Sequence, residues 1–408
     1  MSVENKDHRV IAKELDLYFS EDDGQGLPFL LPNYTIIRNQ IQAFLRQKQK
    51  EFGFQEVITP VLGSEELYQT SGHLPYYQDY MFPTISNISK KKERFRLRPM
   101  TCPHHFLIYQ QKPRSYRELP LRLCEDALLH RYEASGGLKG LERSRWMELS
   151  DHHIFVNSEN LKEEIKKIYY YAKDILANLN FSIERLICSL HDSTNKEKYH
   201  ADEQIWQKSE SLLIELLEEM NLTYLKEKGE AAFYGPKLDF EVKAQDGKYI
   251  TIGTIQLDFI SPQRFNLKYI DKEQNFQIPM IIHHSPIGTY QRFIALLLEK
   301  TGGRLPFWLA PTQLVILPLN NQEEVKNCSE DLQKRLSIAQ FRSEIWSDET
   351  LGYSIKKTHQ KKIPYYLVIG KEEIKTKKMK LHHVYSQKEV ELAPEDLIKY
   401  FESLLTRD

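Results

Sequence analysis

Apolar residues recur at helical spacing in four stretches of the chain. The clearest apolar stripe runs through residues 159–180, and a second follows residues 34–52. The same spacing is found in residues 203–220, approximately, and in residues 289–301, TYQRFIALLLEKT. Apolar positions that repeat every three to four residues are typical of amphipathic helices. We therefore expect a helix in each stretch.

Strand-like runs lie between these helices. The segments LRLCEDALLHRYE (121–133) and RWMELSDHHIFVN (145–157) are joined by SGGLKGLERS, a basic loop rich in glycine. Three further runs follow, namely FYGPKLDFEVKA, KYITIGTIQLDF and PMIIHHSP. Long helices combined with antiparallel strands indicate an α+β fold rather than a wound parallel sheet.

The pattern changes near GGRLPFWLAP, residues 302–311, where two glycines and two prolines mark a domain boundary. Strands and helices alternate beyond it, in the order TQLVILPL, 321–338, RSEIWS, 350–362, YYLVIG and a last helix from Pro394. This alternation predicts a small α/β (βαβ) domain with a mainly parallel sheet. We place the two domains at residues 1–303 and 304–408.

The composition is that of a globular protein, with 41% hydrophobic and 28% charged residues among 408. Because the net charge is −1, a nucleic-acid partner would have to be met by local basic patches. The runs 356–362 and 371–380 are candidates, although solvated surface explains them equally well. Four scattered cysteines, a polar N-terminus and no long apolar run favour a cytoplasmic protein without disulfides or membrane spans.

Basic residues flank the glycine-rich loop. Arg131 and Glu133 precede it, while Arg143 and Arg145 follow it, and Arg292 lies near the start of an apolar helix. Guanidinium groups suit phosphate oxygens, so these residues could clamp an anion. Surface ion pairing around the loop, and an arginine that reaches the surface from the helix, are the alternatives.

One cysteine and three histidine pairs are candidates for a metal site. They come from distant parts of the chain, at or near the ends of apolar strand-like runs. Three ligands from three distant strands would form an open zinc site, whereas ordinary buried histidines and a buried thiol are the alternative. The candidates are Cys102, His104, His105, His152, His153, His283 and His284.

Longer strings resemble a known family. GFQEVITP, HRYEASGGLKGLERSRWMELSDHHIF and IGTYQRF resemble motifs 1, 2 and 3 of class II aminoacyl-tRNA synthetases. More narrowly, RPMTCPHH, SDHHIF, AFYGPKLDF, IQLDF and PMIIHHSPIGTYQRF are similar to threonyl-tRNA synthetases. The resemblance runs from DHRVIAKELDLYF to the last helix. It implies a catalytic domain at 1–303 and an anticodon-binding domain at 304–408, without the amino-terminal editing region of bacterial members.

The resemblance implies that the chain activates threonine with ATP and transfers it to tRNA(Thr). Cys102, His153 and His283 would bind one Zn²⁺, which leaves positions open for the amino group and hydroxyl of threonine. Asp151 would accept a hydrogen bond from that hydroxyl. Valine lacks the hydroxyl and would be rejected.

Further roles follow from the same resemblance. Arg131 would hold the α-phosphate, Glu133 would face the adenine amino group, and Arg143 or Arg145 with Arg292 would hold the outer phosphates together with Mg²⁺. The resemblance also matches residues to the substrate pocket or the reacting centre: Tyr234, Lys237, Gln256 and His73.

Four positions concern departures from the family or the anticodon. Met147 stands where many members place an aromatic ring against adenine, and Thr251 replaces a pocket glutamine. Glu373 matches a position that contacts the anticodon, whereas His382 replaces an arginine there. A neutral histidine lacks the bidentate fork of arginine, which weakens the expected anticodon readout.

Two consequences concern accuracy and assembly. Serine lacks only a methyl group of threonine, so we expect this chain to charge serine appreciably. Motif 1, which ends its strand at Pro60, implies a homodimer. The competing hypotheses are a silent synthetase paralogue, a prolyl-type synthetase and a zinc hydrolase. A silent paralogue is disfavoured because Arg131 and Arg292 are retained. A prolyl-type synthetase is disfavoured by the trio Cys102, His153 and His283. A zinc hydrolase is disfavoured because the sequence has no HExxH string.

Overall fold

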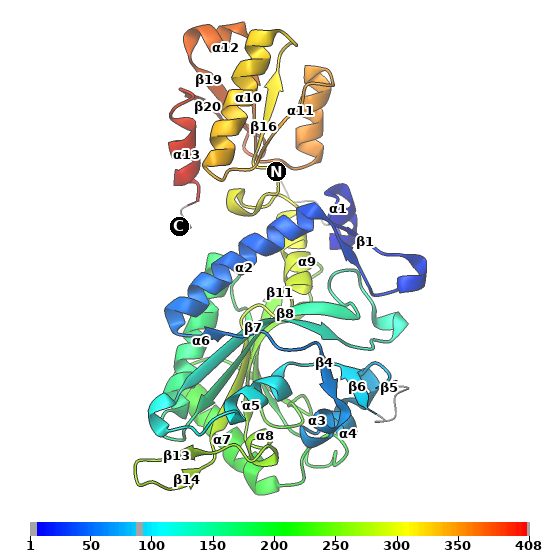
Figure 1. Ribbon diagram of the computed structural model, residues 1–408, viewed down its shortest axis with the longest axis vertical. Helices are drawn as coiled ribbons and strands as arrows, with labels where there is room; N and C mark the ends of the chain where they lie inside the picture. The colour runs from blue at the N-terminus through cyan, green and yellow to red at the C-terminus, as the bar shows by residue number, and fades with distance from the viewer. Residues whose placement is uncertain (1–5, 87–92, 406–408) are drawn as a thin grey trace. The chain divides into compact units, whose positions relative to one another are not determined.

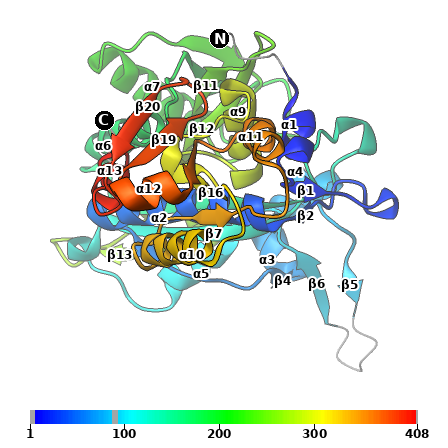
Figure 2. The same ribbon diagram turned by 90° about the horizontal axis from the view of Figure 1, so that it is seen from above.

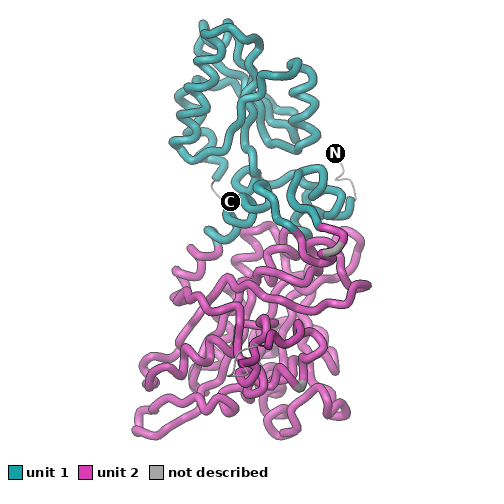
Figure 3. Tube along the Cα trace, turned by 45° about the vertical axis from the view of Figure 1, so that its right-hand side comes forward, with its two compact units in different colours: residues 1–20, 29–44, 295–408 teal, residues 21–28, 45–294 magenta. Residues whose placement is uncertain are grey.

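The computed structural model of the chain describes residues 6–86 and 93–405. It divides into two compact units (Figure 3). Residues 21–28 and 45–294 form the first, which we call the core unit. Residues 1–20, 29–44 and 295–408 form the second, the C-terminal unit. Domain limits at 303 and 304 remain a prediction.

An eight-stranded sheet organises the core unit. Neighbouring strands run antiparallel except at the two edges, where the outermost pairs are parallel. The predicted antiparallel sheet is thus confirmed. In spatial order the strands are β10 (Leu225–Lys228), β9 (Arg185–Leu190), β11 (Lys237–Lys243), β12 (Tyr249–Asp258), β15 (Met280–Ser285), β8 (Trp146–Val156), β7 (Leu121–His130) and β3 (Gln55–Glu56).

The four predicted helices are present, each within two residues of its expected limits. They are α2 (Pro32–Phe52), α6 (Leu161–Asn178), α7 (Glu203–Glu219) and α9 (Tyr290–Thr301). Helix α6 packs on β12 and β15 and buries Ile165, Ile168 and Ile175. Burial of such an apolar stripe against a sheet is the main stabilising contribution of an amphipathic helix.

Shorter elements complete the two units, and those within residues 1–20 and 29–44 belong to the C-terminal unit. The helices are α1 (His8–Glu14), α3 (Glu65–Thr70), α4 (His73–Tyr77), α5 (Cys102–Gln110) and α8 (Ser261–Arg264). The strands are β1 (Tyr18–Phe19), β2 (Phe29–Leu30), β4 (Leu62–Ser64), β5 (Ile85–Ser86), β6 (Arg94–Leu97), β13 (Tyr269–Ile270) and β14 (Phe276–Gln277). No helix within residues 6–86 and 93–405 is long and apolar enough to cross a bilayer.

Two local expectations about the candidate site were wrong. Cys102 does not end a strand but begins helix α5, where Pro103 follows in the first turn. Proline suits that position because its fixed φ is helical and its missing N–H would have no partner there. Arg131 and Glu133 do not belong to a strand either, since β7 ends at His130.

The C-terminal unit contains a five-stranded sheet. In spatial order its strands are β17 (Ser343–Ile345), β16 (Leu314–Pro318), β18 (Tyr365–Ile369), β19 (Met379–His383) and β20 (Glu389–Leu392). Helices α10 (Glu323–Ile338) and α11 (Leu351–Gln360) cover opposite faces of β16 (Figures 1 and 2). Accordingly, Leu314 and Ile316 pack with residues of α10, whereas Val315 and Leu317 pack towards α11.

The sheet of this unit is mixed, so the expectation of a mainly parallel sheet was wrong. β16, β17 and β18 are parallel, but β19 and β20 run antiparallel to their neighbours. The reversal follows helix α12 (Lys371–Thr376), where Lys377 adopts a left-handed conformation with φ 53°. Basic residues dominate this segment and conceal its apolar pattern. The last helix, α13 (Leu397–Ser403), lies where one was expected.

Candidate functional site

Three side chains that can bind a metal converge inside the core unit. The thiol of Cys102 and one ring nitrogen each of His153 and His283 lie within 4.8 Å of one another, and all three side chains are buried. One thiolate and two imidazoles suit Zn²⁺, and three protein ligands are typical of a site that keeps a position for substrate. The donor chemistry therefore fits the zinc ion that the sequence predicts.

Strand pairing explains why two of these residues meet. β8 and β15 are antiparallel neighbours, and His153 is the direct partner of His283 across the pair. Residues directly opposite each other point to the same face of a sheet. Gln256 of β12 is in turn the partner of His283. Three adjacent strands thus carry site residues side by side, while Cys102 approaches from the start of α5.

Each histidine of the trio has a partner on one ring nitrogen. His283 Nε2 lies 3.0 Å from Asp258 Oδ2, and His153 Nδ1 lies 2.9 Å from His105 Nδ1. The opposite nitrogen of each ring is the one that can bind a metal, as is usual for ligand histidines held by an outer partner. Burial, helped by neighbouring histidines, holds the pKa of His153 well below its usual range. The ring is therefore neutral, as metal binding requires.

The trio lines a pocket together with polar side chains. The ring of Tyr234 stacks on that of His283 with centroids 4.6 Å apart, and its hydroxyl donates to Gln256 Oε1 at 2.5 Å. Gly235 lets its own backbone lie close to β12, because a Cβ there would be 1.7 Å from the carbonyl oxygen of Leu257. Asp151 lines the same pocket from β8, and burial raises its pKa.

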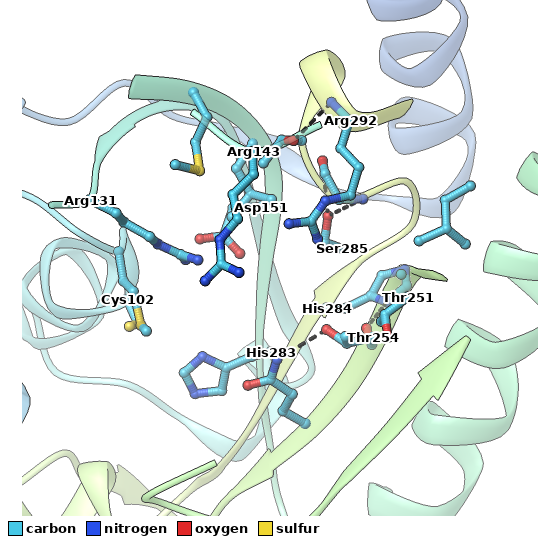
Figure 4. A pocket seen from close by; sticks show the side chains of 18 of the residues that line it. Cys102, Arg131, Arg143, Asp151, Thr251, Thr254, His283, His284, Ser285 and Arg292 are labelled. Carbon is cyan, nitrogen blue, oxygen red and sulfur yellow. Dashed lines mark hydrogen bonds between the residues drawn. The ribbon is translucent and has the colours of Figure 1, made fainter. Parts of the chain in front are cut away.

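Three arginines point into this pocket. Figure 4 shows Arg131, Arg143 and Arg292, which come from different elements and direct their guanidinium groups towards the same space. Arg292 lies in the first turn of α9 and donates its Nε–H to the carbonyl oxygen of Glu142 at 3.2 Å. Burial lowers the pKa of Arg292, and the charges of Arg131 and Arg143 lower it further. Positive groups concentrated in a cleft form a site for a polyanion.

The residues around the glycine-rich loop separate into two groups. Glu133 and Met147 line the pocket, and the Glu133 carboxylate is paired with Arg143, whose Nε lies 2.9 Å from Oε2. Arg145 does not line it. Its Nε donates to the backbone carbonyl oxygen of Glu133 at 3.0 Å, and its guanidinium lies over the ring of Tyr132. Of the two arginines that the sequence leaves open, Arg143 is the one in the pocket.

Two other predicted residues, Lys237 and His73, are not among those that line the pocket. Lys237 forms an ion pair with Asp239 on the same strand. His73 is buried, and its Nε2 lies 3.7 Å from the sulfur of Cys102. Both are next to residues of the site without contributing to the cavity surface.

The residues expected to meet the anticodon lie in the C-terminal unit. Glu373 accepts a hydrogen bond from the backbone N–H of Gly370 at 2.8 Å, which caps α12. His382 stacks on Tyr366 with ring centroids 4.6 Å apart and lies 3.1 Å from a carboxylate oxygen of Glu389. Both side chains are partly exposed and held by local contacts.

Comparisons with known proteins agree with this geometry. Residues 82–301 match the family model of the class II tRNA synthetase core domain (G, H, P, S and T), and residues 313–404 match that of the anticodon binding domain. The threonine–tRNA ligase of Ureaplasma parvum serovar 3 is 44% identical over 404 residues, which are 98% of this chain and 68% of that protein. The chain belongs to the threonine–tRNA ligase family.

Further relatives support the assignment. The threonine–tRNA ligase of Mycoplasmoides gallisepticum is 45% identical over 94% of this chain and 67% of its own length. A crystal structure described as the RNA binding domain of threonyl-tRNA synthetase from Cryptosporidium parvum Iowa II has a TM-score of 0.91 and 33% identity, with 98% of both chains covered. The chain spans 60–68% of the length of the curated relatives that it matches.

Several residues at the pocket could not be recognised from the sequence. Thr254 and Ser285 line the pocket beside Thr251, which the sequence does indicate, but hydroxyl residues at positions 254 and 285 look like ordinary strand residues. Asp258 and Glu125 also escaped notice, although both carboxylates contact histidines at the site. The motif IQLDF contains Asp258, so one signal was present. Glu125 reaches the site only through the pairing of β7 with β8.

Proposed function

We propose that this chain activates threonine with ATP and transfers it to tRNA(Thr). The observation that carries the proposal is one pocket that combines Cys102, His153 and His283 with Arg131 and Arg292. Such a pocket would hold an amino acid with a hydroxyl group beside the phosphates of ATP. Adenylate formation needs such proximity, because the carboxylate must attack the α-phosphate in line with its leaving group.

In the proposed reaction, the polar residues of the pocket select threonine. Zn²⁺, when bound, would supply open coordination positions for the amino group and hydroxyl. Asp151 would accept a hydrogen bond from the hydroxyl, while Gln256, oriented by Tyr234, would present its amide to the amino acid. A site with buried polar groups rejects an analogue that leaves them unpaired by about 10⁴-fold or more. Valine is therefore excluded.

The arginines serve the ATP half of the reaction. Arg131 would hold the α-phosphate and stabilise the charge that develops as it is attacked. Arg143 and Arg292 would hold the outer phosphates, and Mg²⁺ would neutralise those phosphates. Glu133 and Met147 would accommodate adenine. An anion also relieves the repulsion among the three guanidinium groups, so we expect the ATP pocket to be better ordered with ligand than without it.

Serine should be a poor but real substrate of the 408-residue chain. Loss of one methyl group changes binding by about 1–3 kcal/mol, which corresponds to about 10–200-fold. We therefore propose that threonine is preferred over serine within that range when the chain acts by itself. A far larger preference during tRNA charging would contradict this proposal.

The remaining roles extend the same proposal. Glu373 and His382 would contribute to anticodon readout, and His73 and Lys237 would act next to the reacting centre. We propose the cytoplasm as the compartment, since all four cysteines are free thiols. Motif 1 would form a homodimer interface, which agrees with the exposure of Ile58, at 92%, beside the edge strand β3.

Exchange of labelled pyrophosphate into ATP tests the proposal directly. The zinc-loaded chain should support strong exchange with threonine, weaker exchange with serine, and none above background with valine or proline. Arg131→Ala should abolish most exchange, whereas the exposed Arg117→Ala should not. Absence of exchange with all four amino acids, in folded and metal-loaded protein, would favour a silent paralogue instead.

A further inference from the structure

Hydrogen bonds connect the metal-site histidine His153 to a buried carboxylate. His153 Nδ1 lies 2.9 Å from His105 Nδ1, and His105 Nε2 lies 3.2 Å from Glu125 Oε2. All three side chains are buried. The other histidine of the trio, by contrast, contacts its carboxylate directly. The carboxylate of Glu125 can therefore orient the ring of His153 only through His105, whereas Asp258 orients the ring of His283 by a direct hydrogen bond.

The partners of Glu125 decide the direction of these hydrogen bonds. Its Oε1 accepts from Arg98 Nη2 at 2.8 Å and from the backbone N–H of Thr59 at 3.2 Å, while Oε2 accepts from the Thr59 hydroxyl at 2.7 Å. Burial would raise the pKa of Glu125, but hydrogen bonds from His105 and Arg98 lower it to about 2. A carboxylate is an acceptor only, so His105 must donate from Nε2.

The tautomer of His153 follows from this direction. A neutral imidazole has one donor and one acceptor nitrogen. In the neutral form of His105, donation from Nε2 to Glu125 makes Nδ1 an acceptor, and His153 then donates to it from Nδ1. The lone pair of His153 is then on Nε2, on the side of the ring that can bind a metal. The reverse direction would place a proton there and block metal binding.

We propose that Glu125 and His105 are positioning residues that set the metal-binding tautomer of His153. The proposal rests on the zinc site of the proposed function and adds residues that do not touch substrate. Loss of an outer partner of a metal ligand typically costs about 10–100-fold in metal affinity, and we expect effects of this size.

Two substitutions separate hydrogen-bond direction from packing. Glu125→Gln keeps the shape, but Arg98 and the N–H of Thr59 can only donate, so the amide oxygen must face them. The amide NH₂ then faces His105 Nε2 and reverses the chain of hydrogen bonds. His105→Asn places an amide oxygen near the former Nδ1, where it still accepts from His153. His105→Leu removes the acceptor entirely.

The test measures Zn²⁺ affinity of the full chain by competition with a chromogenic chelator. We expect Glu125→Gln and His105→Leu to weaken zinc binding by about 10–100-fold, and His105→Asn to remain close to the unmodified chain. The double variant Glu125→Gln/His105→Asn should recover affinity, because the asparagine no longer depends on residue 125. His104→Asn, on the same helix and also buried, is the matched control and should bind zinc normally.

The outcomes distinguish this proposal from the zinc site itself. If the unmodified chain binds zinc but Glu125→Gln binds it equally well, the positioning role is wrong and the zinc site stands. Equal losses in His105→Asn and His105→Leu would likewise overturn it, and this pair decides the matter if Glu125→Gln does not fold. If the unmodified chain binds no zinc through Cys102, the zinc site of the proposed function fails first.

Discussion

The pocket of the core unit, proposed for threonine and ATP, is built differently from the surface of the C-terminal unit that is proposed for the anticodon. In the pocket, His153 and His283 are buried and each contacts a further buried side chain. In the C-terminal unit, Glu373 caps its own helix and His382 stacks on the neighbouring strand, both partly exposed. Buried charged or metal-binding groups need hydrogen-bond partners from the protein, because water cannot reach them. Partly exposed side chains can also bind water, so contacts within their own element or with a neighbouring strand are enough.

This difference has a consequence for substitutions. A buried network loses function when one member changes, because the remaining polar groups are left unpaired. A surface side chain held by local contacts can be replaced at small cost, and we propose that His382 is such a residue. We therefore expect large effects in the pocket and small effects in the C-terminal unit.

Loss of the zinc site should have the largest effect. Cys102→Ala removes one of three donors, and removal of a metal that stabilises the reacting groups costs several kcal/mol, so threonine-dependent exchange should fall by about 10³-fold or more. Cys188→Ala is the matched control, since Cys188 is equally buried on β9 outside the pocket. Chelation of zinc from the unmodified chain should reproduce the first result, and similar losses in both variants would show a general packing defect.

Removal of Arg131 should rank next. Arg131→Ala deletes a charge aimed into the pocket, and loss of one group that stabilises developing charge costs about 10²–10³-fold in kcat. Pyrophosphate exchange with saturating ATP and threonine measures this effect. Threonine binding, followed by calorimetry, should change little. A loss confined to the KM for ATP would assign Arg131 to ground-state binding instead.

The hydroxyl of Tyr234 should have a moderate effect. Tyr234→Phe keeps the ring on His283 but removes the hydrogen bond to Gln256, worth about 1 kcal/mol, so the KM for threonine should rise about fivefold. Tyr199→Phe serves as control, because it also loses a hydroxyl bonded at 2.5 Å, to the carbonyl oxygen of Gly229. An equal rise in both variants would contradict a specific role for Tyr234.

The C-terminal unit should give the smallest effect. His382→Ala should raise the KM for tRNA(Thr) by less than about tenfold, since histidine lacks the guanidinium fork that makes a bidentate base contact. Pyrophosphate exchange in the absence of tRNA should not change at all. A drop in exchange would mean that this residue acts on the pocket, against the proposed division of roles.

The sequence predicts helices and strands well where buried apolar residues recur at a regular spacing. Helix α6 has Ile165, Ile168 and Ile175 on one face, and this face is buried because the helix packs on a sheet. The apolar spacing in the sequence therefore matches the burial in the structure. Helix α5 was missed for the opposite reason. It is short, with buried residues on all sides, so no apolar face distinguishes it from a strand. The segment around Lys377 was obscured by its charges.

The site was predicted in part. Family resemblance indicates Cys102, His153 and His283, and the structure brings these three together. Their outer partners could not be predicted, because contacts such as Glu125 with His105 depend on the register of β7 against β8 and on the angle at which α5 enters. The sequence pattern does not distinguish Arg143 from Arg145, and only the loop conformation shows which one lines the pocket.

Substitution of cobalt for zinc offers the most direct test of the central claim, that the cysteine–histidine trio holds a metal that recognises a hydroxyl. The Co²⁺-loaded chain should show a thiolate charge-transfer band that disappears in Cys102→Ala. Its visible d–d bands should shift when threonine or serine is added and remain unchanged with valine. A spectrum without the thiolate band, or the same shift with valine as with threonine, would contradict the account.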